Sequence, residues 1–308
     1  MYSEPLSRIL SASMRRLEGE IAQRTPLMAE PVQRWMHSLA GSTHPENYFK
    51  HPVAFPMLLL PWWLEESLSP THDERLQGDI IYSTLNGYYY IRLIDNVMDG
   101  DSSTDLSLLP AAGFFHTEFQ SAYYPYFAAD HPFWPYFREV WACSAESAMW
   151  DAREAVIDES HFVRVAARKV CAGKIPLAAV CYHYGRPDLI EPCAAFVDRL
   201  GCWHQMWNDL FDWNKDLTHQ NQSFFLAEAE RRRRAEESVA AWVVREGFEW
   251  GCTTLQRWMS ELQQMALTQK SAPLEHYLQQ RAAMIADQQT RVKEGFQRLA
   301  KLATLLEG

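Results

Sequence analysis

Two carboxylates with helical spacing form the first group of residues that could carry chemistry. Asp95 and Asp99 follow a long apolar stretch that is rich in tyrosine. Residues three or four apart share one face of a helix, so both carboxylates are expected to point the same way. Arg92 lies one turn earlier, where it could either pair with these carboxylates or bind an anion.

A second stripe of polar side chains lies far downstream in another apolar stretch. Its members, Gln205, Asn208, Asp212 and Asp216, cover about three helical turns on one face. Asp209 falls about 100° around the helix from its neighbour Asn208. We therefore expect Asp209 to be a supporting or surface group and not part of the stripe.

Two carboxylate stripes on apolar helices need a compensating positive charge. Mg²⁺ meets this need because it takes hard oxygen ligands and keeps coordination positions open for the phosphate oxygens of a substrate. Mn²⁺ is the alternative metal. The sequence therefore predicts a divalent-metal site. Its expected ligands, which are also the expected catalytic residues, are Asp95, Asp99, Asn208, Asp212 and Asp216.

The segments that position these side chains are all predicted to be helices. Residues 75–99 and 193–217 carry the two acidic groups, and the first of these helices is apolar almost all round, as in the centre of a bundle. The loop at residues 218–224 is mostly polar and could act as a lid. No strand, repeat or linker is evident, so we predict one all-α domain over residues 1–308. Further helices are expected at residues 6–21, in a short buried stretch after the loop 45–61, and at residues 108–127, 133–152, 159–184 with an interruption near Gly173 and Pro176, 231–268 and 273–306.

The composition restricts the class of protein. Hydrophobic residues make up 47% of the 308 residues and aromatic residues 13%, which argues against disorder. The net charge of −10 argues against general nucleic-acid binding, which normally requires a basic surface. An acidic protein of this kind must bind an anionic substrate through local cations or through a metal.

Cysteine usage and hydropathy predict the compartment. The six cysteines include no CxxC pair, which argues against a zinc site, and their apolar settings are typical of buried thiols in a reducing cytoplasm. The N-terminal residues lack the basic and apolar regions of a signal peptide. The most apolar segment, residues 53–64, is too short to span a bilayer. We expect a cytoplasmic protein without a transmembrane segment, and contact with a membrane surface is left open.

The acidic motifs keep an order and spacing that resemble those of the class I isoprenoid synthases. The run from Arg92 to Asp99 resembles the first motif of squalene and phytoene synthases, with Asn96 in place of the second aspartate. Leu200-Gly201 and the stripe that ends at Asp216 resemble their second motif, LGxxxQxxNxxxDxxxD. The same stripe resembles the metal triad of terpene cyclases, in which Lys215 matches a lysine often found just before the last ligand.

A third segment lies between the two motifs. Residues 168–173, RKVCAG, resemble the segment in which terpene cyclases place a diphosphate-sensing arginine ahead of a glycine at a helix break, and equally the VAG segment of squalene and phytoene synthases. Arg168 is favoured over Lys169 as the phosphate donor because arginine grips phosphate oxygens in a fork, and Lys174 is a third candidate. The resemblance implies substrate contacts by Arg92, Arg168, Lys169, Gln205 and Lys215.

The resemblance implies an enzyme of the isoprenoid synthase type. Its expected reaction is the metal-dependent ionisation of a prenyl diphosphate, with cyclisation or rearrangement of the carbocation, as in a terpene synthase, a lyase of isoprenoid biosynthesis. A squalene- or phytoene-type prenyltransferase that joins two diphosphates is the alternative, although residues 218–225 lack the arginine and tyrosine usual there. Tyr277 and Arg281 only approximate the arginine–tyrosine pair of terpene cyclases. A non-catalytic lipid- or partner-binding module and a homodimer are also left open.

Overall fold

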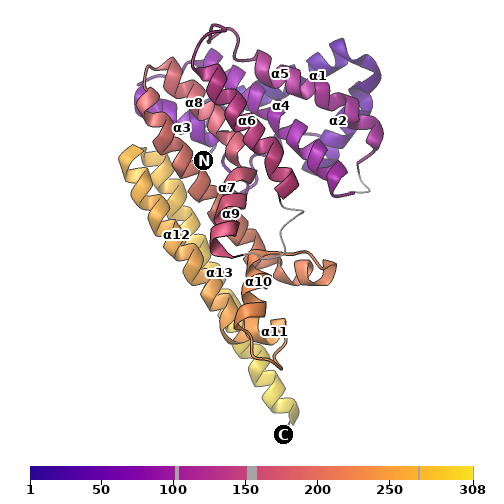
Figure 1. Cartoon of the computed structure of the whole chain (residues 1–308), viewed down its shortest axis with the longest axis vertical. Coiled ribbons are helices and arrows are strands. Elements are labelled where there is room, and N and C mark those ends of the chain that lie inside the picture. Colours follow the sequence, from indigo (N-terminus) through magenta and orange to yellow (C-terminus); the bar gives the residue numbers. More distant parts are fainter. Residues whose placement is uncertain (101–103, 151–157, 270, 308) are drawn as a thin grey trace. The chain divides into compact units, whose positions relative to one another are not determined.

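The computed structural model describes residues 1–100, 104–150, 158–269 and 271–307, and every regular element in these ranges is helical (Figure 1). The all-α prediction is confirmed for this part of the chain. Contacts divide the chain into two compact units. Unit 1 comprises Met1–Ala148 and Cys171–Ala194, and unit 2 comprises Met149–Val170 and Ala195–Gly308. That both units belong to one domain over residues 1–308 stays a prediction.

Unit 1 is organised around α4 (Glu74–Met98), against which α1 (Glu4–Arg24) and α5 (Leu109–Ser121) pack. Residues on all sides of α4 are buried along most of its length, as its apolar sequence predicts. A Cβ at Gly87 would lie only 3.0 Å from the ring of Phe119 on α5, so the glycine permits the close approach of the two helices. The other elements of unit 1 are α2 (Pro26–Ala40), η1 (Pro45–Asn47), α3 (Leu59–Leu68), η2 (Leu106–Leu108), most of α6 (Phe133–Trp150), η3 (Cys171–Gly173), α8 (Lys174–His183), η4 (Pro187–Leu189) and the first turn of α9 (Ile190–His219).

One predicted helix ends earlier in the structure than expected, and one predicted helix interruption is present. The helix expected at residues 108–127 ends at Ser121, and the chain then forms turns up to Phe127. Pro125 accounts for the early end, because proline lacks the amide hydrogen and disfavours helical geometry in the residue before it. The interruption expected near Gly173 is confirmed: α7 (Glu159–Lys169) ends before it and α8 begins after it.

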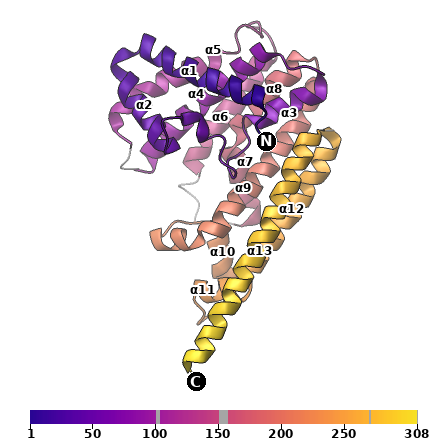
Figure 2. The same cartoon turned by 180° about the vertical axis from the view of Figure 1, so that it is seen from behind.

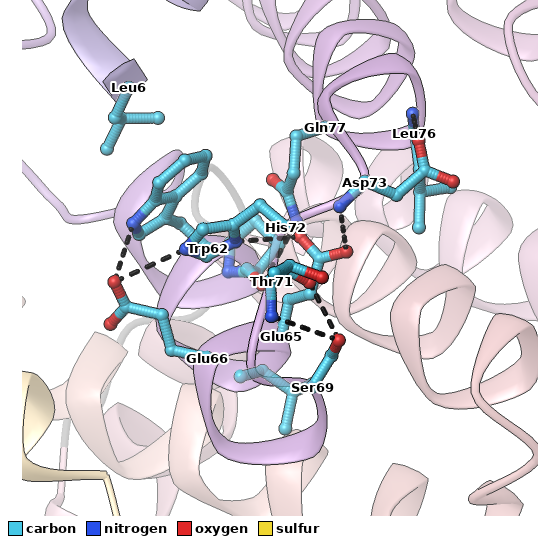
Figure 3. Close-up of polar contacts among 12 residues, drawn as sticks. Leu6, Trp62, Glu65, Glu66, Ser69, Thr71, His72, Asp73, Leu76 and Gln77 are labelled. Atoms are coloured by element: carbon cyan, nitrogen blue, oxygen red, sulfur yellow. Dashed lines mark hydrogen bonds and ion pairs between the residues drawn. The ribbon is translucent and has the colours of Figure 1, made fainter. Parts of the chain in front are cut away.

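A buried carboxylate joins three segments of unit 1 (Figure 3). Glu65 on α3 is fully buried, and its oxygens lie 3.0 Å from Nδ1 of His72, 3.0 Å from the backbone nitrogen of Asp73 and 2.7 Å from Nε2 of Gln77. The hydroxyl of Tyr184, just after α8, donates to the same carboxylate at 2.5 Å. Four donors offset the cost of burying this charge and tie α3, the start of α4 and the end of α8 together.

Unit 2 contains α7, the rest of α9, and the C-terminal helices. Among the latter, α12 (Phe248–Gln269) and α13 (Ala272–Glu307) run side by side (Figure 2). On α9, a Cβ at Gly201 would lie 2.3 Å from Cγ2 of Val170 and 3.0 Å from the carbonyl oxygen of Ala166. Only glycine therefore allows α9 to pass this close to the end of α7.

The single helix expected at residues 231–268 is wrong. The structure has α10 (Phe224–Arg232), α11 (Val239–Trp242), a π-helical turn η5 (Val243–Gly247) and then α12. Arg233 has extended backbone angles, and Ser238 caps the next helix by accepting a hydrogen bond from the amide of Ala241. Arg233 donates to the carbonyl oxygen of Glu237, and Arg245 pairs with the carboxylate of Glu237. These contacts stabilise a turn where the sequence alone indicates a continuing helix.

The six cysteines have free thiols, and all but the half-buried Cys143 are buried, as expected. The apolar residues 53–64 lead into the short buried helix α3. In the described ranges, no helix has the combination of length and apolar character needed to cross a membrane.

Replacing Glu65 should destabilise the protein strongly. In Glu65→Gln one oxygen acceptor becomes a donor, so buried donors lose their partner, and we expect unfolding free energy to fall by ~2–4 kcal/mol. Urea unfolding followed by circular dichroism measures the change. The control is Glu30→Gln, which removes an exposed ion pair with Arg34 and should cost under ~0.5 kcal/mol. Equal effects of the two variants would contradict the role of Glu65.

Candidate functional site

The first acidic motif lies at the C-terminal end of α4 in unit 1. Asp95 is half-buried within the helix, and Asp99 is the exposed residue that caps it. The backbone N–H of Asp99 donates to the carbonyl oxygen of Asp95 at 2.8 Å, so the helical turn continues through both residues. The structure thus keeps the i, i+4 spacing expected of the two carboxylates.

Asn96 replaces the second aspartate of the related motif and has a structural role in unit 1. Its side chain is 2% exposed, and its Nδ2 donates to Oγ1 of Thr104 at 2.9 Å. A neutral amide avoids the desolvation cost that a carboxylate would have at this buried position. Asn96 therefore supports the end of α4 and leaves Asp95 and Asp99 as the candidate ligands of this motif.

Arg92 lies among aromatic side chains one turn before Asp95. Its Nε is buried and finds no hydrogen-bond partner among the described residues. Burial raises the pKa of the Tyr88 phenol, one turn earlier, well above its ordinary value. The nearby positive charge of Arg92 acts in the opposite direction. The rings of Tyr48 and Phe49 pack against Tyr88 at centroid distances of 5.1 Å. An unsatisfied guanidinium nitrogen is consistent with the predicted contact between Arg92 and an anion.

The second motif lies on α9 in unit 2. Asn208 and Asp212 are exposed, and Asp216 is half-buried. Within the described residues, the side chains of Asn208 and Asp212 make no hydrogen bond or ion pair, whereas Asp216 accepts a hydrogen bond from Nδ2 of Asn221 at 3.4 Å. The three oxygen-bearing side chains occupy successive turns of one helix face, as predicted. Lys215 is exposed beside them.

Asp209 has a larger structural role than its position beside the stripe indicates. It is 3% exposed, and its oxygens accept hydrogen bonds from Nε2 of Gln205 at 2.8 Å and from the backbone N–H of Phe224 at 3.0 Å. Burial raises the pKa of Asp209 to about 6, while these two hydrogen bonds and the charge of Lys169 act in the opposite direction. In the sequence, only the i, i+4 spacing of Gln205 and Asp209 indicates the contact between their side chains. Nothing in the sequence indicates the contact between Asp209 and the backbone of Phe224. The predicted substrate contact of Gln205 stays a prediction, since its amide is engaged here.

The end of α7 brings two cations close to the second motif within unit 2. Arg168 is half-buried and Lys169 is exposed in the last turn of that helix. The absence of a side chain at Gly201 lets α9 lie against this turn, and the effect of Lys169 on Asp209 reflects their proximity. The third candidate, Lys174, begins α8 and belongs to unit 1.

The approximate C-terminal counterpart of the arginine–tyrosine pair is buried beside α9. The guanidinium of Arg281 lies 4.8 Å from the ring centroid of Tyr277, and both residues are at most 4% exposed. The hydroxyl of Tyr277 lies 3.3 Å from Nε2 of His204. Desolvation, aided by Arg281, lowers the pKa of His204 to about 3, so this imidazole is neutral at physiological pH.

The predicted site residues divide between the two units, and the donor set fits a hard cation. Across the described ranges, no three His, Cys, Asp or Glu side chains gather closely enough to hold a metal by themselves. Each unit instead offers two aligned carboxylates, and α9 adds an amide oxygen. These oxygens suit Mg²⁺, which completes its coordination with water and substrate phosphate. Unit 1 holds Arg92, Asp95 and Asp99, and unit 2 holds Arg168, Lys169, Gln205, Asn208, Asp212, Lys215 and Asp216.

The raised pKa of Asp209 predicts a distinct pH dependence of stability in the metal-free protein. Because folding favours the protonated carboxyl, its stabilising contribution is complete below the unfolded pKa and is lost as pH rises through about 6. Asp209→Asn stays neutral and should not lose it. The unfolding free energy of the variant relative to wild type should therefore rise by up to ~3 kcal/mol between about pH 4 and about pH 7. Urea unfolding at a series of pH values tests this, and a pH-independent difference would contradict it.

Comparison with protein-family models finds no match to this chain, and a search of curated proteins finds no significant relative. The resemblance to class I isoprenoid synthases therefore stands on the motifs and their placement on helices.

Proposed function

We propose that this protein is a class I terpene synthase that ionises a prenyl diphosphate with Mg²⁺ or Mn²⁺. One observation carries the proposal. Asn208, Asp212 and Asp216 present oxygen atoms on successive turns of α9, and the first two have no partner among the described residues. The carboxylates of Asp212 and Asp216, one turn apart, repel each other, and a bound cation relieves that repulsion.

The chain supplies cations for the leaving group from the same unit. Arg168 and Lys169 at the end of α7 lie near α9, and the exposed Lys215 lies on α9 itself. These side chains would hold the diphosphate as it departs. The metal, when bound, would neutralise the negative charge that develops on the leaving oxygen.

Aromatic side chains on α9 suit the second half of the reaction. Trp207 and Phe211 are half-buried, and their rings pack in a tilted arrangement at a centroid distance of 4.3 Å. Trp203 stacks on Trp207 at 5.6 Å. The faces of aromatic rings attract positive charge. Rings close to the metal motif could therefore stabilise a carbocation after diphosphate departs, while keeping water away from it.

Two positions favour the alternative, a prenyltransferase of the squalene or phytoene type. Gly201 and Gln205 belong to the second motif of those enzymes and are not part of the terpene cyclase triad. Both have a structural role here: Gly201 allows the close approach of α7, and Gln205 donates to Asp209. These structural roles favour the second motif of the prenyltransferases. The lack of arginine and lysine in residues 218–225 favours the terpene cyclase instead.

Removing one oxygen ligand from α9 should weaken metal binding and leave the fold intact. We expect Asp212→Ala and Asn208→Ala each to weaken Mn²⁺ binding at least ~10-fold, because the ligands are exposed and Asp212 has no structural contact to lose. Electron paramagnetic resonance titration measures free Mn²⁺, and circular dichroism measures the melting temperature. The control, Asp287→Ala on α13, removes an exposed carboxylate that pairs with Arg291 and should bind Mn²⁺ as wild type does. Unchanged binding in Asp212→Ala would remove α9 as the metal site.

Product analysis separates the two enzymatic functions. We expect purified protein with Mg²⁺ to convert one member of a series of prenyl diphosphates into a hydrocarbon or alcohol with the same number of carbons, and to release diphosphate. Gas chromatography with mass spectrometry identifies the product, and exhaustive chelation should abolish its formation. A product with twice the number of carbons would move the protein to the prenyltransferase alternative. Full turnover after chelation would contradict both.

A further inference from the structure

The loop that follows the second acidic motif is attached to α9 at both of its ends. At the start, the backbone N–H of Asn221 donates to the carbonyl oxygen of Asp216 at 2.9 Å, and its side-chain amide lies 3.4 Å from the carboxylate of the same residue. Gln220 enters the left-handed region with φ of 58°, which reverses the chain there. At the end, the N–H of Phe224 donates to the buried carboxylate of Asp209 at 3.0 Å. Both attachment points belong to the helix that carries the candidate ligands.

The contact with Asp209 also satisfies the beginning of α10. The first amides of a helix have no partner within the helix, and Phe224 is the first residue of α10. Ser223 accepts a hydrogen bond from Leu226, and Asp209 accepts one from Phe224. A carboxylate at this position also interacts favourably with the positive end of the helix dipole.

The ring of Phe224, whose backbone N–H is bonded to Asp209, packs against α7. It stacks on Phe162 of α7 with ring centroids 4.7 Å apart and planes inclined by 22°. Phe224 also packs against Trp250 with ring centroids 5.8 Å apart, and it borders a cavity of about 350 Å³ that Trp250, Arg232 and others line. The residue is 2% exposed, so the packing of its ring and the hydrogen bond of its backbone to Asp209 together fix where α10 begins.

We propose that Asp209 is a positioning residue that holds residues 220–224 in place beside the candidate ligands Asn208, Asp212 and Asp216. Direct metal ligation by Asp209 does not fit, because it is 3% exposed and both of its oxygens accept hydrogen bonds. The expected effect of Asp209 on metal affinity rests on the proposed function, whereas its expected effect on residues 220–224 is independent of that function.

Amide hydrogen exchange measures the anchor in the wild-type protein. The amide of Phe224 should exchange ~100-fold more slowly than that of Ala240, an exposed first-turn residue of α11. In Asp209→Ala, exchange of amides 221–226 should accelerate at least ~10-fold. Asp209→Asn keeps an oxygen acceptor for the Phe224 amide, and the amide of Gln205 can turn its oxygen towards the new NH₂ group, so exchange should stay within ~3-fold of wild type. Fast exchange of the Phe224 amide in wild type would refute the anchor even if Asp209→Ala does not fold.

Metal affinity distinguishes positioning from a merely structural role. Titration with Mn²⁺ should show ~10-fold weaker binding in Asp209→Ala and recovery in Asp209→Asn, because outer groups that orient ligands have effects of this size. The control is Glu228→Gln, which disturbs another buried carboxylate whose ion-pair partners, Arg231 and Arg232, lie on α10 itself. It should change neither Mn²⁺ affinity nor the exchange of residue 224.

Four results would overturn the proposal, and they fall into three cases. Fast exchange of the Phe224 amide in wild type, or unchanged exchange in Asp209→Ala, would show that Asp209 does not hold the loop. Faster exchange with wild-type Mn²⁺ affinity would reduce Asp209 to a structural role. If wild type itself binds no Mn²⁺ while the exchange results are as expected, the proposed function fails, and the positioning role for metal ligands fails with it.

Discussion

Burial of carboxylates within an acidic helical protein is the constraint on which the rest of this structure depends. A buried carboxylate is tolerated only where several donors converge on it, so each one fixes the segments that supply those donors. Glu65 gathers four donors from three segments of unit 1. Glu118 accepts hydrogen bonds from Tyr82 at 2.8 Å and Arg24 at 3.0 Å, which attaches α5 to α4 and α1. In unit 2, Asp209 holds the start of α10 to α9 in the same way.

Glycine at close helix contacts is a second constraint, and it determines which charges lie near the candidate metal ligands. At Gly201 and at Gly251 an added Cβ would lie 2.3 Å from Val170 and 2.6 Å from Leu210 respectively. The first contact places the end of α7, with Arg168 and Lys169, against α9. The second packs α12 onto the opposite side of the same helix. Close packing of α7 and α12 on two sides of α9 therefore limits the movement of the helix that carries the candidate ligands.

Neighbouring residues on α9 have different roles because they differ in helical phase. Asn208 and Asp212 face outward without partners in the described structure, and Asp209 faces inward with two. A turn of about 100° per residue separates them. Exposed oxygens without partners are available to a cation, whereas the inward carboxylate is committed to the fold. On α4, the buried Asn96, which is bonded to Thr104, likewise lies about 100° around the helix from the half-buried Asp95.

Hydrophobic periodicity alone determined the helical class, the long helix that became α4, and the acidic stripe on α9, because each depends on residues a few positions apart. Tertiary structure decided what depends on residues far apart. The donors to Glu65 come from residues 72, 73, 77 and 184, and the donor that anchors Asp209 to α10 is a backbone amide that no side-chain pattern reveals. The division of residues 231–268 into separate helices likewise involves contacts of Glu237 with Arg233 and Arg245, which local helix propensity does not encode. Local periodicity records which face of a helix is apolar, but a buried charge is stabilised only by the groups that the completed fold brings to it.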